Sequence, residues 1–132
     1  MTAVGLLCRQ YSGINPRNPS LLAGLERLKA PPPEKLNNVY YLYYATQVMH
    51  HMNGDSWKFW QWGPDGKGPG GIREVLLAKQ DGGYTPAHDH QMSSWGGSSG
   101  GRIMATSLSL LMLEMDYHKL LLFKKEAPKP NK

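Results

Sequence analysis

The sequence predicts an all-α protein in which about five helices pair as antiparallel hairpins. Apolar residues recur with helical spacing in five segments, and no window shows the clean alternation of a half-buried strand. The helices also fall into two alternating kinds. The first, third and fifth are apolar on nearly all sides, whereas the second and fourth have a charged face. We therefore expect an inner layer of helices covered by an outer layer.

The five helices are expected at residues 2–11, 19–30, 37–52, 71–80 and 101–123. In the second helix, Asn18 is a good N-cap, the following proline suits the first helical turn, and the proline run at 31–33 ends the helix. The charged residues of this helix fall opposite its leucines, so one face should point to water.

The third and fifth helices are expected to be buried. Asn37 or Asn38 can cap the third helix, and Asn53 with Gly54 should stop it, because both tolerate a left-handed backbone. In the fifth helix the stretch 107–115 has only two serines and one glutamate among apolar residues. Such a helix requires burial on most of its surface.

Residues 1–123 are expected to form one domain, because a chain of 132 residues can enclose one modest core. The net charge is +5, but four of the fifteen basic residues lie in residues 124–132, beside two prolines. We expect these nine residues to be a disordered, solvated tail. Because the tail also contains Glu126, its net charge is +3 and the remaining body carries only about +2, which is little for a polyanion-binding surface.

Composition excludes several classes. The single cysteine, Cys8, excludes an internal disulfide and a cysteine-rich zinc site. We see no secretory signal and no apolar run of membrane-spanning length, so a soluble, cytoplasmic protein is expected by default. The aromatic residues are interleaved with aliphatic ones and not with Lys or Arg, so we do not expect nucleic-acid binding. A helical module that binds nucleic acid through its basic tail is kept as a third alternative.

A short pattern recurs in the three apolar helices: TAVGLLC at 2–8, TQVMHHM at 46–52 and TSLSLLM at 106–112. Each copy has a threonine, an apolar residue two positions later and a sulfur residue at the seventh position. This spacing suits one helical hairpin per repeat, with loops of variable length between hairpins.

The stretch REVLLAKQDGGYTPAHDHQMSSWGGSSGGRIMATSLSLLMLE, preceded by YYLYYATQVMHHMNGDSWKFW, resembles the prenyltransferase and squalene-oxidase repeat of squalene-cyclase-like bacterial proteins. The resemblance covers most of the chain apart from the basic tail. It implies an α/α toroid, in which inner and outer helices alternate and a Gln–Trp motif links each hairpin to the next. The structural residues that it implies, with those that should open the next inner helix, are Gln80, Gly82, Tyr84, Gly100, Gly101 and Arg102.

In the family, the glutamine amide bridges backbone groups at a helix end and the aromatic ring stacks on it. Tyr84 stands where the family usually has tryptophan, so the ring face is kept but the motif is imperfect. A complete toroid needs about twice as many helices as we count. The chain therefore resembles a C-terminal arc, either as a fragment or as a partial barrel that buries its apolar faces by self-association or against another chain.

The motifs that carry the family's chemistry are missing. The chain has no Asp-x-Asp-Asp acid of the triterpene cyclases and no Cys-Gly-Glu-Gln thioester, and Leu6 stands where a prenyltransferase zinc site would place an aspartate before Cys8. We therefore expect a non-catalytic structural or interaction module without a cofactor. The alternative is an enzyme, or a subunit of one, that binds an isoprenoid or triterpenoid ligand in an aromatic cavity.

Three further features are candidate binding sites. The cavity of the alternative would be lined by Tyr40, Tyr41, Tyr44, Trp57, Trp60 and Trp95, although such rings more often pack in a core. His88 and His90 could bind a metal, with Asp89 or the histidines at 50 and 51, but too few ligands have suitable spacing and we expect no metal site. The glycines of 96–102 could cradle an anion, but Arg102 and Ile103 stand where a phosphate loop needs Lys and Ser or Thr.

Overall fold

The computed structural model describes residues 2–66, 70–80 and 101–117, and every regular element in these ranges is helical. The elements are α1 (Thr2–Tyr11), α2 (Pro19–Lys29), η1 (Pro33–Lys35), α3 (Val39–Met52), α4 (Gly54–Trp62), α5 (Ile72–Ala78), α6 (Gly101–Leu113) and η3 (Met115–Tyr117), where η marks a 3₁₀ turn. The predicted all-α class is therefore confirmed for the described part of the chain. The predicted tail at 124–132 lies outside it.

The described ranges contain six α-helices against about five expected, and the additional one is α4 at residues 54–62. Asn53, with a φ of 56°, ends α3 by donating its backbone N–H to the carbonyl oxygens of Met49 and His50. Its side-chain oxygen then accepts a hydrogen bond of 2.7 Å from the N–H of Gly54. The Asn-Gly pair stops α3 as expected, but the same asparagine also caps the start of a new helix.

The other helix ends agree with the sequence to within a few residues. Asn18 caps α2 by accepting from the N–H of Ser20, and Asn38 caps α3 by accepting from the N–H of Tyr41 at 3.0 Å. The helix expected at 71–80 is shorter, at 72–78. The helix expected at 101–123 ends at residue 113 and is followed by η3, while 118–123 lie outside the described residues.

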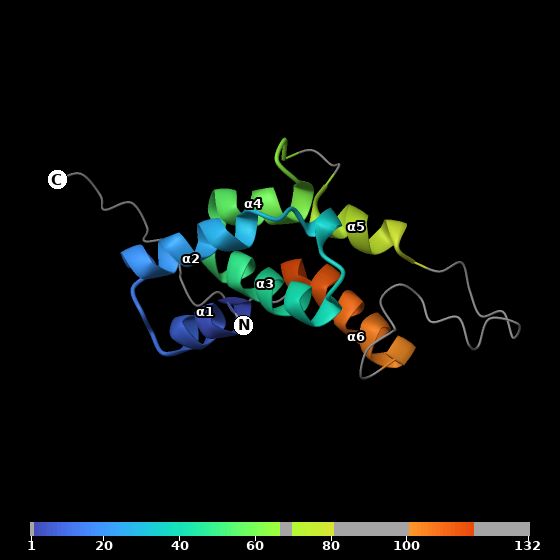
Figure 1. Cartoon of the computed structure of the whole chain (residues 1–132), viewed down its shortest axis with the longest axis horizontal. Coiled ribbons are helices and arrows are strands. Elements are labelled where there is room, and N and C mark those ends of the chain that lie inside the picture. The colour runs from blue at the N-terminus through green and yellow to red at the C-terminus, as the bar shows by residue number, and fades with distance from the viewer. Residues whose placement is uncertain (1, 67–69, 81–100, 118–132) are drawn as a thin grey trace, which may run out of the picture.

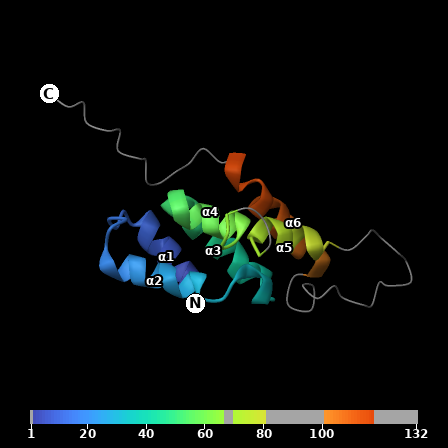
Figure 2. The same cartoon turned by 90° about the horizontal axis from the view of Figure 1, so that it is seen from above.

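The helices form two layers, with α3 at the centre of one of them. α3 packs against α1, α6 and α4, while α2 packs on α1, and α5 packs on α4 and η1. Figure 1 shows α2, α4 and α5 along the upper side of the molecule and α1, α3 and α6 along the lower side. In Figures 1 and 2 alike, α3 lies between α1 and α6. The three apolar helices therefore share one layer, and the amphipathic α2 and α5 lie in the other.

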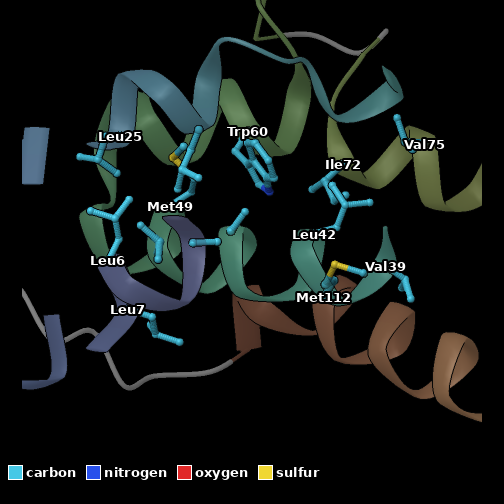
Figure 3. Close-up of a cluster of buried hydrophobic side chains, with 14 of the residues drawn as sticks. Leu6, Leu7, Leu25, Val39, Leu42, Met49, Trp60, Ile72, Val75 and Met112 are labelled. Atoms are coloured by element: carbon cyan, nitrogen blue, oxygen red, sulfur yellow. The ribbon is translucent and has the colours of Figure 1, made fainter. Parts of the chain in front are cut away.

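The hydrophobic core lies between these layers. Trp60 of α4 is fully buried, and Figure 3 shows its ring pointing toward the opposite layer, in the region of Met49 and Leu42. Its indole N–H donates a 2.9 Å hydrogen bond to the Thr46 hydroxyl, which in turn donates at 2.7 Å to the carbonyl oxygen of Leu42. This relay satisfies the polar groups that the core encloses.

The expectation that the last helix is buried on most of its surface was wrong. Within α6, Ala105 and Met112 are buried, but Ile103 is 84% exposed and Leu110 is 53% exposed. The physical reason is position: α3 covers one side of α6, and α6 stands at the edge of its layer.

Candidate functional site

Three of the six structural residues that the resemblance implies lie in the described part of the chain. Gln80 is exposed beyond the end of α5, and its backbone N–H donates to the carbonyl oxygen of Leu77 at 3.2 Å. Gly101 and Arg102 begin α6. Gly101 has a φ of 60°, and a Cβ added there would meet nothing within 4 Å, so the glycine suits the left-handed backbone conformation at the start of α6. The other members lie outside the described residues: Gly82, Tyr84 and Gly100. The role of these residues in linking helical hairpins stays a prediction.

The aromatic residues proposed for a cavity occupy different environments. Trp60 fills the core, whereas Tyr40 is half exposed on α3. The Tyr44 hydroxyl donates to the Tyr40 hydroxyl at 2.9 Å, and this hydrogen bond raises the pKa of Tyr44. Tyr41 packs against the core, and burial raises the pKa of its phenol. Trp95 lies outside the described residues.

Trp57, the remaining member of that set, helps to hold the turn after α6. Its indole N–H donates to one carboxylate oxygen of Asp116 at 3.0 Å, and the side-chain amide of Gln61 donates to the other. A small pocket beside this contact is lined by Trp57, Gln61, Ile72, Arg73, Met112 and Leu113. Its cavity volume of about 10 Å³ is roughly that of one water molecule, too little for an isoprenoid chain.

The two adjacent histidines of α3 are both buried, at 6% exposure each. His51 faces α1, where its Nδ1 lies 3.2 Å from the side-chain oxygen of Gln10 and its ring contacts the edge of the Tyr11 ring. His50 faces α4, and its ring lies edge-on to Trp57 with centroids 5.0 Å apart. Both histidines therefore sit where helices meet.

The hydrogen bonds of Gln10 define which nitrogen of His51 carries the proton. The Gln10 amide nitrogen donates to the carbonyl oxygen of Val48 at 3.2 Å, which leaves its side-chain oxygen as the acceptor for His51. Nδ1 of His51 must then be the protonated nitrogen of the neutral ring. Burial, with a smaller contribution from neighbouring His50, lowers the pKa of His51. This arrangement suits a neutral histidine that joins α1 to α3.

Metal binding by these groups finds no support in the described ranges. There, no group of three or more His, Cys, Asp or Glu side chains is placed to hold an ion. The loop candidates His88 and His90 lie outside these ranges. Among the described helices, none is both long enough and apolar enough to cross a membrane.

The feature that the sequence analysis missed is the exposed side of α6. Leu111 is 37% exposed and Tyr117 is 83% exposed, in addition to the two residues named above. We call this surface the α6 face and define it by seven exposed residues of α6 and η3: Ile103, Thr106, Ser107, Leu110, Leu111, Glu114 and Tyr117. Three of its residues, at 103, 110 and 117, are spaced seven apart.

Helix geometry explains why these residues share one side. Residues seven apart on an α-helix differ by only about 20° around its axis, which places Ile103 and Leu110 on one side of α6, while Tyr117 follows in η3. η3 follows α6 directly, since the N–H of Tyr117 donates to the carbonyl oxygen of Glu114 at 2.9 Å. The opposite side of α6 carries Ala105, Leu108 and Met112, which pack in the core. The seven-residue spacing was visible in the sequence, but the core side is equally apolar and hides the pattern.

Searches of protein-family models, of curated proteins and of solved structures each found no match to this chain. The resemblance to the squalene-cyclase-like repeat and the toroid that it implies therefore stay proposals.

Proposed function

We propose that this protein is a non-catalytic helical module that binds another protein chain through the α6 face. The observation that supports this function is the exposure of large apolar side chains, Ile103, Leu110 and Tyr117, along one side of one helix. Contiguous exposed apolar patches of more than a few hundred Å² mark interaction sites in many monomers. Burying one such side chain contributes about 1.5–3 kcal/mol, so a partner that covers three of them gains appreciable affinity.

We further propose that the module is an arc of a squalene-cyclase-like α/α toroid. The side-by-side arrangement of α1, α3 and α6 supports this proposal, because these helices carry the three copies of the short sequence repeat. The copies are not equivalent in detail, since Thr46 is buried whereas Thr2 and Thr106 are exposed. In such an arc, the α6 face lies where the next inner helix would pack.

The contacts of the polar groups favour a structural role over catalysis. His51 bonds to Gln10, and Gln10 also donates to the backbone of α3, while the Asp116 carboxylate accepts from Trp57 and Gln61. These side chains hold helices together, as expected of a scaffold.

Site-specific photo-crosslinking in cells that express the full chain tests the proposed function. A photoreactive phenylalanine analogue replaces Leu110 on the α6 face. The matched control replaces Leu22, an exposed leucine of α2 with 43% exposure against 53% for Leu110. We expect a protein adduct from position 110 and none from position 22. Adducts of equal yield from both positions, or from neither, would contradict a specific interaction face.

A further inference from the structure

We infer that the α6 face binds the same face of a second copy of this chain, with the two α6 helices antiparallel about a two-fold axis at Leu110. The inference rests on the proposed function, because it names the partner of the same face. A two-fold interface brings one surface patch against itself, so the patch must be complementary to its own rotated copy. The arrangement of the α6 face meets this requirement.

The apolar residues of the face are placed symmetrically around its centre. In an antiparallel pair, a residue that follows Leu110 by some number of positions lies opposite the residue that precedes it by the same number. Ile103 of α6 and Tyr117 of η3 are each seven positions from Leu110, so we infer that each side chain lies near the other in the second copy. Leu110 meets its own copy. These contacts place apolar surface against apolar surface along the whole face.

The polar residues of the face follow the same symmetry. Thr106 and Glu114 each lie four positions from Leu110, so the Thr106 hydroxyl faces the partner's Glu114, to which it can donate a hydrogen bond. The two Glu114 carboxylates lie eight positions apart along the paired helices, or about 12 Å at 1.5 Å per residue. Salt screens charges at about that distance. A parallel pair would instead bring the two carboxylates together, which favours the antiparallel arrangement.

A head-to-tail contact, in which the α6 face covers α1 of the next copy, fits the surface less well. The exposed residues of α1 are Thr2, Gly5, Cys8, Arg9 and Tyr11, of which only Tyr11 is large, and its hydroxyl donates to the Gln47 side chain of α3. A Cβ added at Gly5 would meet nothing within 4 Å, so this side is open and has no aliphatic bulk. Burying the Arg9 guanidinium against the leucines of α6 would carry a desolvation penalty. A closed pair is therefore favoured over an open chain of copies.

The size of the face sets the expected strength. A standard protein interface uses about 20–30 residues on each side, and the α6 face has seven. We therefore expect a reversible dimer with a dissociation constant between about 1 μM and 1 mM.

Sedimentation velocity on the full chain, from about 1 μM to about 1 mM, tests the dimer. The apparent mass of the unchanged protein should rise with concentration from 14.8 kDa toward twice that value. Leu110→Glu puts two carboxylates together on the two-fold axis and should weaken the dimer at least tenfold. The matched variant Leu22→Glu on α2 should associate like the unchanged protein, and circular dichroism should show equal helicity for all three. A monomer at every concentration, or equal association of the two variants, would overturn the inference.

A second variant tests the antiparallel register. Thr106→Lys introduces an ammonium group that faces the partner's Glu114 in the antiparallel pair, so it should tighten the dimer several-fold at low salt. In a parallel pair the same change brings two lysines together and weakens the dimer. Loss of affinity on Thr106→Lys would therefore overturn the antiparallel arrangement, whereas a gain supports it.

Failure of this inference can be told apart from failure of the proposed function. If the purified chain stays monomeric but position 110 captures a different protein in cells, the α6 face is an interaction face with another partner and only the self-association is wrong. If the captured protein is a second copy of this chain, both stand. If position 110 captures nothing and the chain is monomeric, both fail.

Discussion

Thr46 is the residue on which the buried indole of Trp60 depends for its hydrogen bond. Thr46→Val keeps the shape of the side chain but removes the oxygen, which leaves the Trp60 N–H without its 2.9 Å acceptor. An unsatisfied buried donor costs about 1–3 kcal/mol, so the free energy of unfolding should fall by that amount. Urea denaturation followed by circular dichroism measures it. Thr46→Ser keeps the oxygen, so its free energy of unfolding should fall clearly less than that of Thr46→Val. An equal fall in both variants would contradict the role of Thr46 as the acceptor for Trp60.

His51 should make the stability depend on pH. Burial lowers the pKa of its imidazole in the folded protein, and unfolding returns the group to a pKa of about 6.5. Below about pH 6.5 the unfolded chain binds a proton that the folded chain does not. The free energy of unfolding should therefore be greatest above that pH and decrease as the pH falls toward the folded pKa. The groups around His51 are His50 on its own helix and Gln10 and Tyr11 on α1.

His51→Asn isolates this contribution, because an asparagine amide can still donate toward Gln10 but does not titrate. Comparing urea denaturation at about pH 7.5 and about pH 5.5 should show a larger drop in stability for the unchanged protein than for the variant. An identical drop in both proteins would show that His51 does not couple folding to pH.

Residue-level features could be predicted from the sequence when they depended on neighbours in the chain. The caps Asn18 and Asn38 act on N–H groups two or three positions away, and both were foreseen. The pairing of His51 with Gln10 joins residues 41 positions apart. No local pattern marks such a contact, because it exists only once α1 and α3 pack together.

Gly71 controls how closely α5 approaches the end of α4. A Cβ at this position would overlap the carbonyl oxygen of Gln61 and lie 2.7 Å from the backbone nitrogen of Gly63. Gly71→Ala should therefore lower the free energy of unfolding by about 1–3 kcal/mol, the usual range for overpacking. Gly5→Ala is the matched control, because a Cβ there meets open space within α1; it should stabilise by up to about 1 kcal/mol. Thermal or urea unfolding measures both, and a neutral Gly71→Ala would contradict the close approach.

The sequence misassigned α4 and α6 for two different reasons. α4 was missed because Asn53-Gly54 is a strong stop signal, yet Gly54 is itself the first of the nine residues of α4. α6 was assigned to the interior because apolar residues surround it on nearly all sides. Composition shows that a surface prefers burial, but not whether the folded chain provides a neighbour to bury it. Within the described residues, α6 packs mainly on α3, while α4 and α5 meet its C-terminal end, and the α6 face lies away from these contacts.

The layer of α1, α3 and α6 has two edges of opposite character. At α1 the exposed residues other than Tyr11 are small or polar, while α6 exposes large aliphatic side chains. A layer with one apolar edge can bury that edge in a closed pair of copies. A layer with two apolar edges would add copies at both edges without limit. Under the proposed self-association, the α1 edge offers no comparable aliphatic face, so we expect association to stop at two copies.

If the α6 face joins two copies, the thermal stability of the whole molecule should depend on protein concentration. Dissociation accompanies unfolding, so a higher concentration favours the folded dimer by mass action. Above the dissociation constant, each tenfold rise in protein concentration adds about 1.4 kcal/mol per dimer, or about half of that per chain, to the free energy of unfolding. For a chain of this size, that raises the melting temperature by about 2 °C. Scanning calorimetry over a hundredfold range of concentration measures the shift. Leu110→Glu should melt at one temperature throughout, and Leu22→Glu should shift like the unchanged protein. A melting temperature of the unchanged protein that stays constant over this range would contradict a dimer that is stable enough to contribute to folding.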